Sequence, residues 1–184
     1  QKNWFILTKN NLFKISSNLD YSVLNTIKYM WIYSLAIVVL TFFTMEFIAW
    51  FTHKYVMHGI LWVLHKDHHQ VDPNHFFERN DFFFLIFALP SILAFVVGVE
   101  GGFNHWFFVG VGITIYGFAY FLVHDVFIHQ RFKLFRNSNS VYFRAIRKAH
   151  KVHHKHLNKE DGECFGMLWV PIKYFKEARR AAKR

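Results

Sequence analysis

Three long blocks of apolar residues constrain this chain more than any other feature. They run from Met30 to Phe51, from Phe82 to Val99 and from Trp106 to Val123, and the only charged residue in them is Glu46. A helix that crosses the hydrocarbon layer of a membrane needs about 17–25 such residues, whereas a core helix of a soluble protein usually shows a polar stripe. The sequence therefore predicts three membrane-spanning helices and argues against an ordinary soluble domain.

Most of the basic residues lie on one side of these blocks: eighteen follow the first block on that side, against the four lysines of the N-terminal segment on the other, Lys2, Lys9, Lys14 and Lys28. The chain has 22 Lys and Arg against 12 Asp and Glu, which gives a formal charge of +10. Cations lie between the first and second blocks and concentrate after the third, while the turn at residues 100–105 has none. Because basic loops tend to stay on the cytoplasmic side, we expect both basic segments to face the cytoplasm. This placement, without a recognisable nucleic-acid-binding motif, indicates no nucleic acid partner.

Ten of the thirteen histidines fall into four tight groups. Two groups are pairs with four residues between the histidines, and two are triads in which a histidine is followed, after two residues, by a doublet. A pair and then a triad follow the first apolar block, and the same order follows the third block, so the chain contains two copies of one array. The ten are His53, His58, His65, His68, His69, His124, His129, His150, His153 and His154.

Helical geometry limits what these spacings can do. Positions i, i+3 and i+4 of an α-helix lie within a sector of about 100°, so each triad is expected to aim its three imidazoles at one place. The two members of a pair differ by about 140° on a regular α-helix. Either they serve different metals, or a π-helical turn brings them together.

The array points to metal binding. Imidazole suits zinc, copper, iron and nickel, and ten ligands exceed what one ion accepts, so two ions are expected. The Glu-x-x-His pattern of carboxylate-bridged di-iron bundles is absent and Cys164 is the only cysteine, so we expect an almost wholly histidine ligand set. His75, His105 and His156 lie outside the array and are interpreted as ordinary side chains.

Four acidic residues near the array are candidates to hold a histidine ring by accepting its second N–H. For the aspartates among them, helix capping or solvation is an equally good interpretation. For the glutamate, inside the first apolar block, the alternative is a carboxylate hydrogen-bonded within the bundle. The four are Glu46, Asp67, Asp81 and Asp125.

The amino-acid sequence around the histidines is similar to that of a known family. The stretches are EFIAWFTHKYVMHGILWVLHKDHHQ (residues 46–70), ERNDFF (78–83), YGFAYFLVHDVFIHQRF (116–132), KAHKVHHKH (148–156) and FGMLWVP (165–171). Together they resemble the bacterial β-carotene 3-hydroxylases of the fatty-acid hydroxylase superfamily. The resemblance covers roughly residues 45–171, and residues 1–29 have no counterpart in it.

The resemblance implies an activity. It implies a non-haem di-iron monooxygenase that uses O2 to hydroxylate C3 of each β-ionone ring, converting β-carotene to zeaxanthin by way of β-cryptoxanthin. The ten histidines would hold two iron ions, with zinc possible in a purified sample, and ferredoxin and its reductase would supply electrons. A related di-iron oxygenase acting on a sterol, a fatty acyl chain or another lipid is the alternative. Metal transport is disfavoured, because transporters place ligands near the bilayer midplane and these histidines lie at the ends of the spans.

We therefore predict an all-α integral membrane protein: a transmembrane helical bundle with a cytoplasmic histidine-rich cap, in contact with membrane lipid and a carotenoid. Three spans are clear, whereas the family is more commonly described with four. The predicted regions are an N-terminal leader of uncertain structure (1–29), the membrane-embedded di-metal hydroxylase domain (30–171) and a basic C-terminal tail (172–184). The resemblance implies a bacterial inner membrane, with the active site on its cytoplasmic face.

Overall fold

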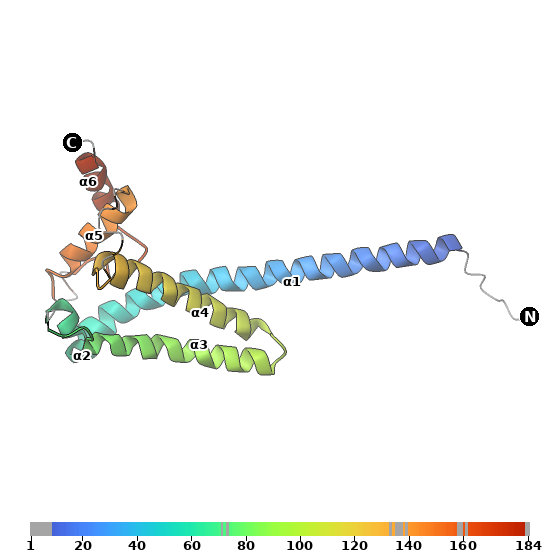
Figure 1. Cartoon of the computed structure of the whole chain (residues 1–184), viewed down its shortest axis with the longest axis horizontal. Coiled ribbons are helices and arrows are strands. Elements are labelled where there is room, and N and C mark those ends of the chain that lie inside the picture. Colours follow the sequence, from blue (N-terminus) through green and yellow to red (C-terminus); the bar gives the residue numbers. More distant parts are fainter. Residues whose placement is uncertain are drawn as a thin grey trace, which may run out of the picture.

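A computed structural model describes residues 9–182, except for 71, 73, 133, 135–137, 139, 158, 159 and 161, and it describes side chains from residue 20 onward. Every regular element in this part of the chain is a helix (Figure 1). In order, the elements are α1 (Lys9–Phe51), a π-helix η1 (Thr52–Ile60), α2 (Trp62–His69), a 3₁₀ turn η2 (Arg79–Asp81), α3 (Phe82–Glu100), α4 (His105–Phe121), a π-helix η3 (Leu122–Ile128), α5 (Val141–His153) and α6 (Ile172–Ala182).

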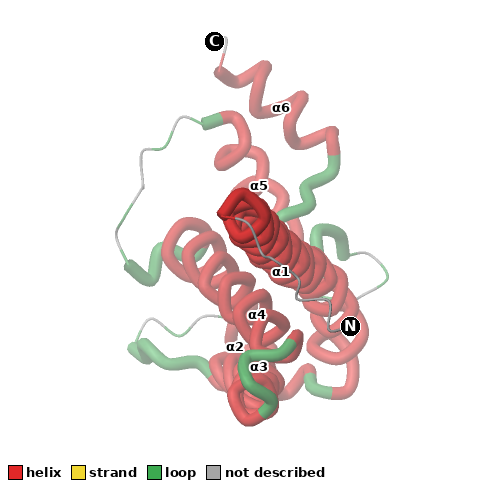
Figure 2. The backbone as a smooth tube through the Cα atoms, turned by 90° about the vertical axis from the view of Figure 1, so that its right-hand side faces the viewer, coloured by secondary structure: helices red, strands yellow, loops and turns green. Residues whose placement is uncertain are grey.

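Three helical segments of the described chain are long and apolar enough to cross a membrane, as predicted. They are Asp20–Ile60, Arg79–Glu100 and His105–Ile128, and α4 packs against both α1 and α3 (Figures 1 and 2). Large apolar side chains such as Leu40, Phe84 and Phe118 are exposed on their outer faces. Such faces are stable against lipid tails, so the predicted membrane bundle is confirmed.

Small residues let these helices approach closely. A Cβ added to Gly112 of α4 would lie 2.6 Å from Thr41 Cβ and 2.9 Å from the Val38 carbonyl oxygen of α1. A Cβ on Gly98 of α3 would meet the backbone of Phe107 in α4. Close backbone approach at small residues is a common way for helices to associate in membranes. At Gly98 and Gly112, a larger side chain would push the neighbouring helix away and break these close contacts.

The first helix is longer than the first apolar block. The segment expected as a leader of uncertain structure is helical from Lys9 onward and continues directly into the span, and residues 1–8 lie outside the described residues. In Figure 1 this part of α1 projects well beyond the turn that joins α3 and α4. At about 1.5 Å per residue, the 43 residues of α1 reach about 65 Å, roughly twice the thickness of the hydrocarbon layer.

The remaining elements gather at the opposite end of the bundle and form a cap. Helix α5 packs on α6 through Ala145, Ile146 and Ala149, which meet Tyr174 and Ala178. The segment from residue 172 to 182, expected as a basic tail, thus forms a helix that contributes to this small core. The predicted domain boundaries themselves stay predictions.

Candidate metal centre

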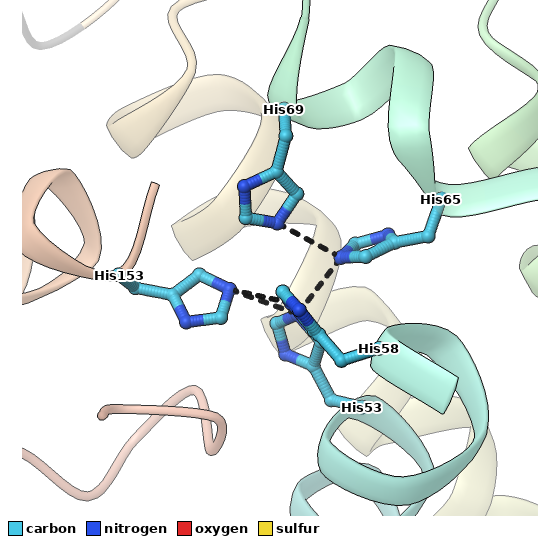
Figure 3. Close-up of side chains that lie close together, drawn as sticks. All are labelled: His53, His58, His65, His69 and His153. Atoms are coloured by element: carbon cyan, nitrogen blue, oxygen red, sulfur yellow. Dashed lines mark hydrogen bonds between the residues drawn. The ribbon is translucent and has the colours of Figure 1, made fainter. Parts of the chain in front are cut away.

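The cap brings the histidines of the array together. The first histidine group is His53, His58, His65, His69 and His153, and the second histidine group is His68, His124, His129 and His150. Within each group, one ring nitrogen from every histidine lies within 4.8 Å of the others. Figure 3 shows the rings of the first histidine group pointing toward one another from η1, α2 and α5.

The two π-helices explain how each pair acts together. His53 and His58 both lie in η1, and both belong to the first histidine group. His124 lies in η3 and His129 directly follows it, and both belong to the second histidine group. A π-helix has i→i+5 hydrogen bonds, so residues five apart come onto one face. Of the two possibilities that the spacing left open, the structure has the π-helical one.

Each triad is divided between the two groups, so the expectation that its three rings converge on one place is wrong. His65 and His69 join the first histidine group, while His68 joins the second; His150 joins the second, while His153 crosses to the first. The reason is geometric: on an α-helix i and i+4 are about 40° apart, whereas i+3 and i+4 are about 100° apart. The i+3 ring therefore faces the other half of the cap.

The tenth histidine lies between the two groups. The Nε2 of His154 is 2.9 Å from the Nε2 of His150, and its ring stacks on that of His69 with 4.3 Å between centroids. In the other copy of the array, His69 Nε2 lies 3.2 Å from His65 Nε2. His154 and His69 thus occupy corresponding positions in the two halves.

Carbonyl oxygens fix the protonation of four rings in the first histidine group. The acceptors are the backbone oxygens of Phe165, Leu157 and Glu163 for His53, His58 and His153, at 2.9, 3.0 and 3.1 Å, and Asn80 Oδ1 for His65 at 2.6 Å. A carbonyl oxygen only accepts, so each Nδ1 carries the hydrogen and donates it. Each Nε2 of a neutral ring is therefore left with a lone pair.

These lone pairs face one another. His53 Nε2 lies 3.1 Å from the Nε2 atoms of His65 and His153, and His58 Nε2 lies 3.2 Å from that of His153 (Figure 3). Two lone pairs repel at such distances and form no hydrogen bond. A cation among them removes the repulsion, so the donor set of the first histidine group fits a metal ion.

The second histidine group has the same character. Nε2 of His68 and Nε2 of His124 are buried and have no hydrogen-bond partner, although such atoms are normally satisfied. Nδ1 of His68 donates to Glu78 Oε2 at 2.8 Å, and Nδ1 of His124 lies 3.4 Å from Asp125 Oδ2. The two unpartnered nitrogens are the atoms that a metal ion would take.

Burial favours the neutral form of the histidines that lie outside the spans. It is the main reason that the pKa of His65 falls to about 3 and that of His154 to about 4, and neighbouring imidazoles lower both further. The same two causes hold the pKa of His68 and of His150 well below the usual range. A metal ligand must be deprotonated, so at neutral pH these rings are in the form that binds.

The four acidic candidates have different positions. Only Asp125 meets a histidine ring directly. Asp67 accepts the Arg79 backbone N–H, and Asp81 pairs with Arg131 and accepts the backbone N–H of Glu78, so neither meets a ring. The capping interpretation holds for Asp81, which forms a capping box around η2.

Glu46 hydrogen-bonds to the segment after α5, which carries two of the carbonyl acceptors, those of Glu163 and Phe165. Its Oε1 accepts the backbone N–H groups of Met167, Leu168 and Trp169 at 2.9, 2.8 and 3.1 Å, and its Oε2 accepts the Tyr116 hydroxyl at 2.7 Å. It is thus a carboxylate hydrogen-bonded within the bundle, the second interpretation of this residue. The carbonyl oxygens of Glu163 and Phe165, which orient His153 and His53, lie just before residue 167. Glu46 therefore supports the orientation of these two rings indirectly.

Sequence reasoning missed three side chains of the site. Glu78 and Asn80 accept from His68 and His65, and Arg131 binds Glu78, Asp81 and Asp125. Glu78 and Asn80 lie in ERNDFF, a stretch that the family resemblance had marked, and that was the available signal. His75, His105 and His156 lie outside both histidine groups, as expected.

Comparison with known proteins agrees with this geometry. A sequence model described as fatty acid hydroxylase matches residues 38–173, which include the whole array. A protein named beta-carotene hydroxylase from Pantoea ananas is 38% identical over 143 residues, covering 77% of this chain and 80% of that protein. One of the same name from Paracoccus sp. (strain PC1) is 35% identical over 136 residues, covering 73% and 83%.

A plant protein, named beta-carotene 3-hydroxylase, chloroplastic, from Gentiana lutea, is 36% identical over 134 residues, covering 69% of this chain and 40% of that protein. No solved structure matches the chain. The family model spans well over half of the chain and the bacterial relatives are matched over most of their length. The chain belongs to the fatty acid hydroxylase family.

Proposed function

We propose that this chain is a membrane-bound non-haem di-iron monooxygenase that hydroxylates C3 of the β-ionone rings of β-carotene, forming zeaxanthin by way of β-cryptoxanthin. The observation that carries the proposal is the pair of buried histidine groups whose Nε2 lone pairs converge. The names of the bacterial and plant relatives support the substrate, and the plant relative's name supports position C3.

Each histidine group would hold one iron ion, with His154 beside both, and zinc can take the same ligands in a purified sample. Iron bound there would supply the oxidation: one C–H bond, O2, two electrons and two protons give one C–OH group and one water. The chain contributes placement and exclusion of water. His65, His68 and His153 are at most 1% exposed, so the reaction is kept away from bulk solvent.

The setting suits a lipid-soluble substrate. The histidine groups lie where the first and third spans end, and exposed apolar side chains such as Phe76, Phe77 and Ile60 lie on neighbouring segments. A C40 hydrocarbon dissolves in the bilayer and would enter from it sideways. From the distribution of basic residues we propose that this end of the bundle faces the cytoplasm. The bacterial relatives support a bacterial inner membrane as its location.

We propose that electrons come from reduced ferredoxin, regenerated by its reductase. Helix α5 has two unlike faces: His150 and His153 are buried on one, while Arg144, Lys148 and Lys151 are exposed on the other. An acidic donor docked on the basic face would be one helix away from the histidines, and complementary charge speeds such encounters. Changing Arg144 and Lys148 to Glu is expected to slow turnover with ferredoxin most at low salt; an unchanged rate across a salt series would discard this docking face.

The decisive experiment is expression of the full chain in cells that accumulate β-carotene, with pigments analysed by chromatography. We expect β-cryptoxanthin and zeaxanthin, and neither from a His153→Ala variant. The family description favours one alternative, a hydroxylase of a fatty acyl chain or another lipid. Unmodified β-carotene together with newly hydroxylated lipids would replace the carotenoid proposal by that alternative.

A further inference from the structure

The two histidine groups differ in what holds their rings. In the first histidine group, the oxygens that accept Nδ1–H from His53, His58, His65 and His153 are three backbone carbonyls and one side-chain amide. All four acceptors are uncharged. The rings are oriented, but nothing that accepts from them adds negative charge.

In the second histidine group the acceptors are carboxylates. Glu78 Oε2 lies 2.8 Å from His68 Nδ1, and Asp125 Oδ2 lies 3.4 Å from His124 Nδ1. The side chains of both acids are largely withdrawn from water, at 11% and 17% exposure. Their charge therefore acts on the rings with less screening than at an open surface.

A single cation holds these carboxylates in place. Arg131 lies 3.1 Å from Glu78, 2.8 Å from Asp81 and 3.4 Å from Asp125, and its own side chain is 16% exposed. One guanidinium thus meets three carboxylates, so the local charge beside the second histidine group is negative. No corresponding carboxylate accepts from a ring of the first histidine group among the described residues.

We infer that the two groups form unequal metal sites, and that the second histidine group binds a divalent ion more tightly because Glu78 and Asp125 support its rings. A carboxylate acceptor makes an imidazole a stronger donor than a carbonyl does, and it also attracts the cation directly. The ions would then bind in order, the second histidine group first. This inference rests on the two metal sites of the proposed function.

The test uses the full chain in detergent micelles, freed of metal with a chelator and titrated with Co²⁺ alone. Two binding steps are expected. Glu78→Gln keeps an acceptor but removes its charge, and should weaken the tighter step by about tenfold, the usual cost of disturbing such a partner, while leaving the weaker step unchanged. Asn80→Asp is the reciprocal variant, since it places a charged acceptor on His65, and it should strengthen the weaker step.

Arg79→Gln is the matched control, because it also removes a charge from the turn that carries Glu78. Arg79 pairs with Asp67, which is not one of the two acids beside a histidine ring. This variant should leave both steps unchanged. Two equal steps in the native chain, or a Glu78→Gln variant that weakens the weaker step, would overturn the inference. If Glu78→Gln does not fold, Asn80→Asp and Asp125→Asn decide: an unchanged weaker step in the first, or an unchanged tighter step in the second, overturns it.

This titration is independent of β-carotene. A chain that hydroxylates β-carotene but shows two equal steps would refute only the inference. A chain that binds no Co²⁺ would refute the metal centre of the proposed function itself. Two unequal steps without carotenoid products would leave the inference standing and redirect the search to another lipid substrate.

Discussion

His153 joins the two halves of the cap, since it comes from α5 and yet lies 3.1 and 3.2 Å from His53 and His58 of η1. We expect His153→Ala to lower the rate of hydroxylation at least about 100-fold. Mutating a residue that only hydrogen-bonds to a metal ligand already costs about 10–100-fold, and removing the ligand itself should cost more. Iron content per chain, measured by elemental analysis, should fall in parallel.

His105→Ala is the control for this variant, because His105 is exposed at the start of α4, at the far end of the bundle. Its activity and iron content should equal those of the native chain. Near-normal turnover by His153→Ala would remove that residue from the metal centre, whatever the control shows.

Single residues were predictable where their chemistry is visible in the sequence. The spacing marked all ten histidines, nine of which the structure brings into the two groups. The acceptors behind them were not predictable, because three are backbone oxygens, and any residue type has one. Arg131 was missed for a related reason: its role depends on its hydrogen bond to Asp81, which lies 50 positions away in the chain.

At the scale of elements, Glu46 connects the first span to the segment after α5. Glu46→Ala would leave the N–H groups of Met167 and Leu168 and the Tyr116 hydroxyl without their acceptor. Each buried donor left unsatisfied costs about 1–3 kcal/mol, so the loss of an acceptor for these donors should lower the free energy of unfolding by at least about 3 kcal/mol. Thermal unfolding in detergent measures this.

Hydroxylation by Glu46→Ala should fall more than stability alone explains, because the segment also carries the Phe165 carbonyl that orients His53. Thr44→Ala, on the same helix, removes only an exposed hydrogen bond to the Leu40 carbonyl and should change neither quantity. Equal unfolding temperatures for the two variants would show that Glu46 does not hold the segment.

The contact of α4 with α1 gives a second prediction at this scale. In Gly112→Ala the new Cβ would lie 2.6 Å from Thr41 and 2.9 Å from a backbone oxygen of α1, so one helix must move. We expect a loss of about 1–3 kcal/mol, typical of overpacking, measured by thermal unfolding. Gly117→Ala, on the same helix but with no atom within 4 Å of the added Cβ, should be neutral or slightly stabilising.

The helices themselves followed from hydropathy, because a long uncharged apolar block has few other stable folds. The π-helices did not. The four-residue spacing of His53 and His58 fits two arrangements, and only the backbone of η1 decides between them. The assignment of His68 to the second histidine group and of His153 to the first also depends on how α2 and α5 are placed relative to each other. No local sequence pattern contains that information.

At the scale of the whole molecule, the cap buries imidazoles that stay neutral in the folded chain but take up protons in the unfolded chain below about pH 6.5. Burial lowers the pKa of seven histidines outside the spans; it is about 3 for His65 and about 4 for His154. The seven are His65, His68, His69, His129, His150, His153 and His154. Between pH 6.5 and these lower values the unfolded chain therefore binds protons that the folded chain does not.

Stability of the metal-free chain is complete above about pH 6.5, the ordinary histidine pKa, and is lost as the pH falls below it, by up to about 1.4 kcal/mol per pH unit for each such histidine. The unfolding temperature in detergent should hence drop steeply between pH 6.5 and 5.5. The slope should be shallower in His154→Ala, which removes one of these groups, and unchanged in His105→Ala. Identical slopes in the two variants would mean that protonation of the cap does not drive the acid unfolding.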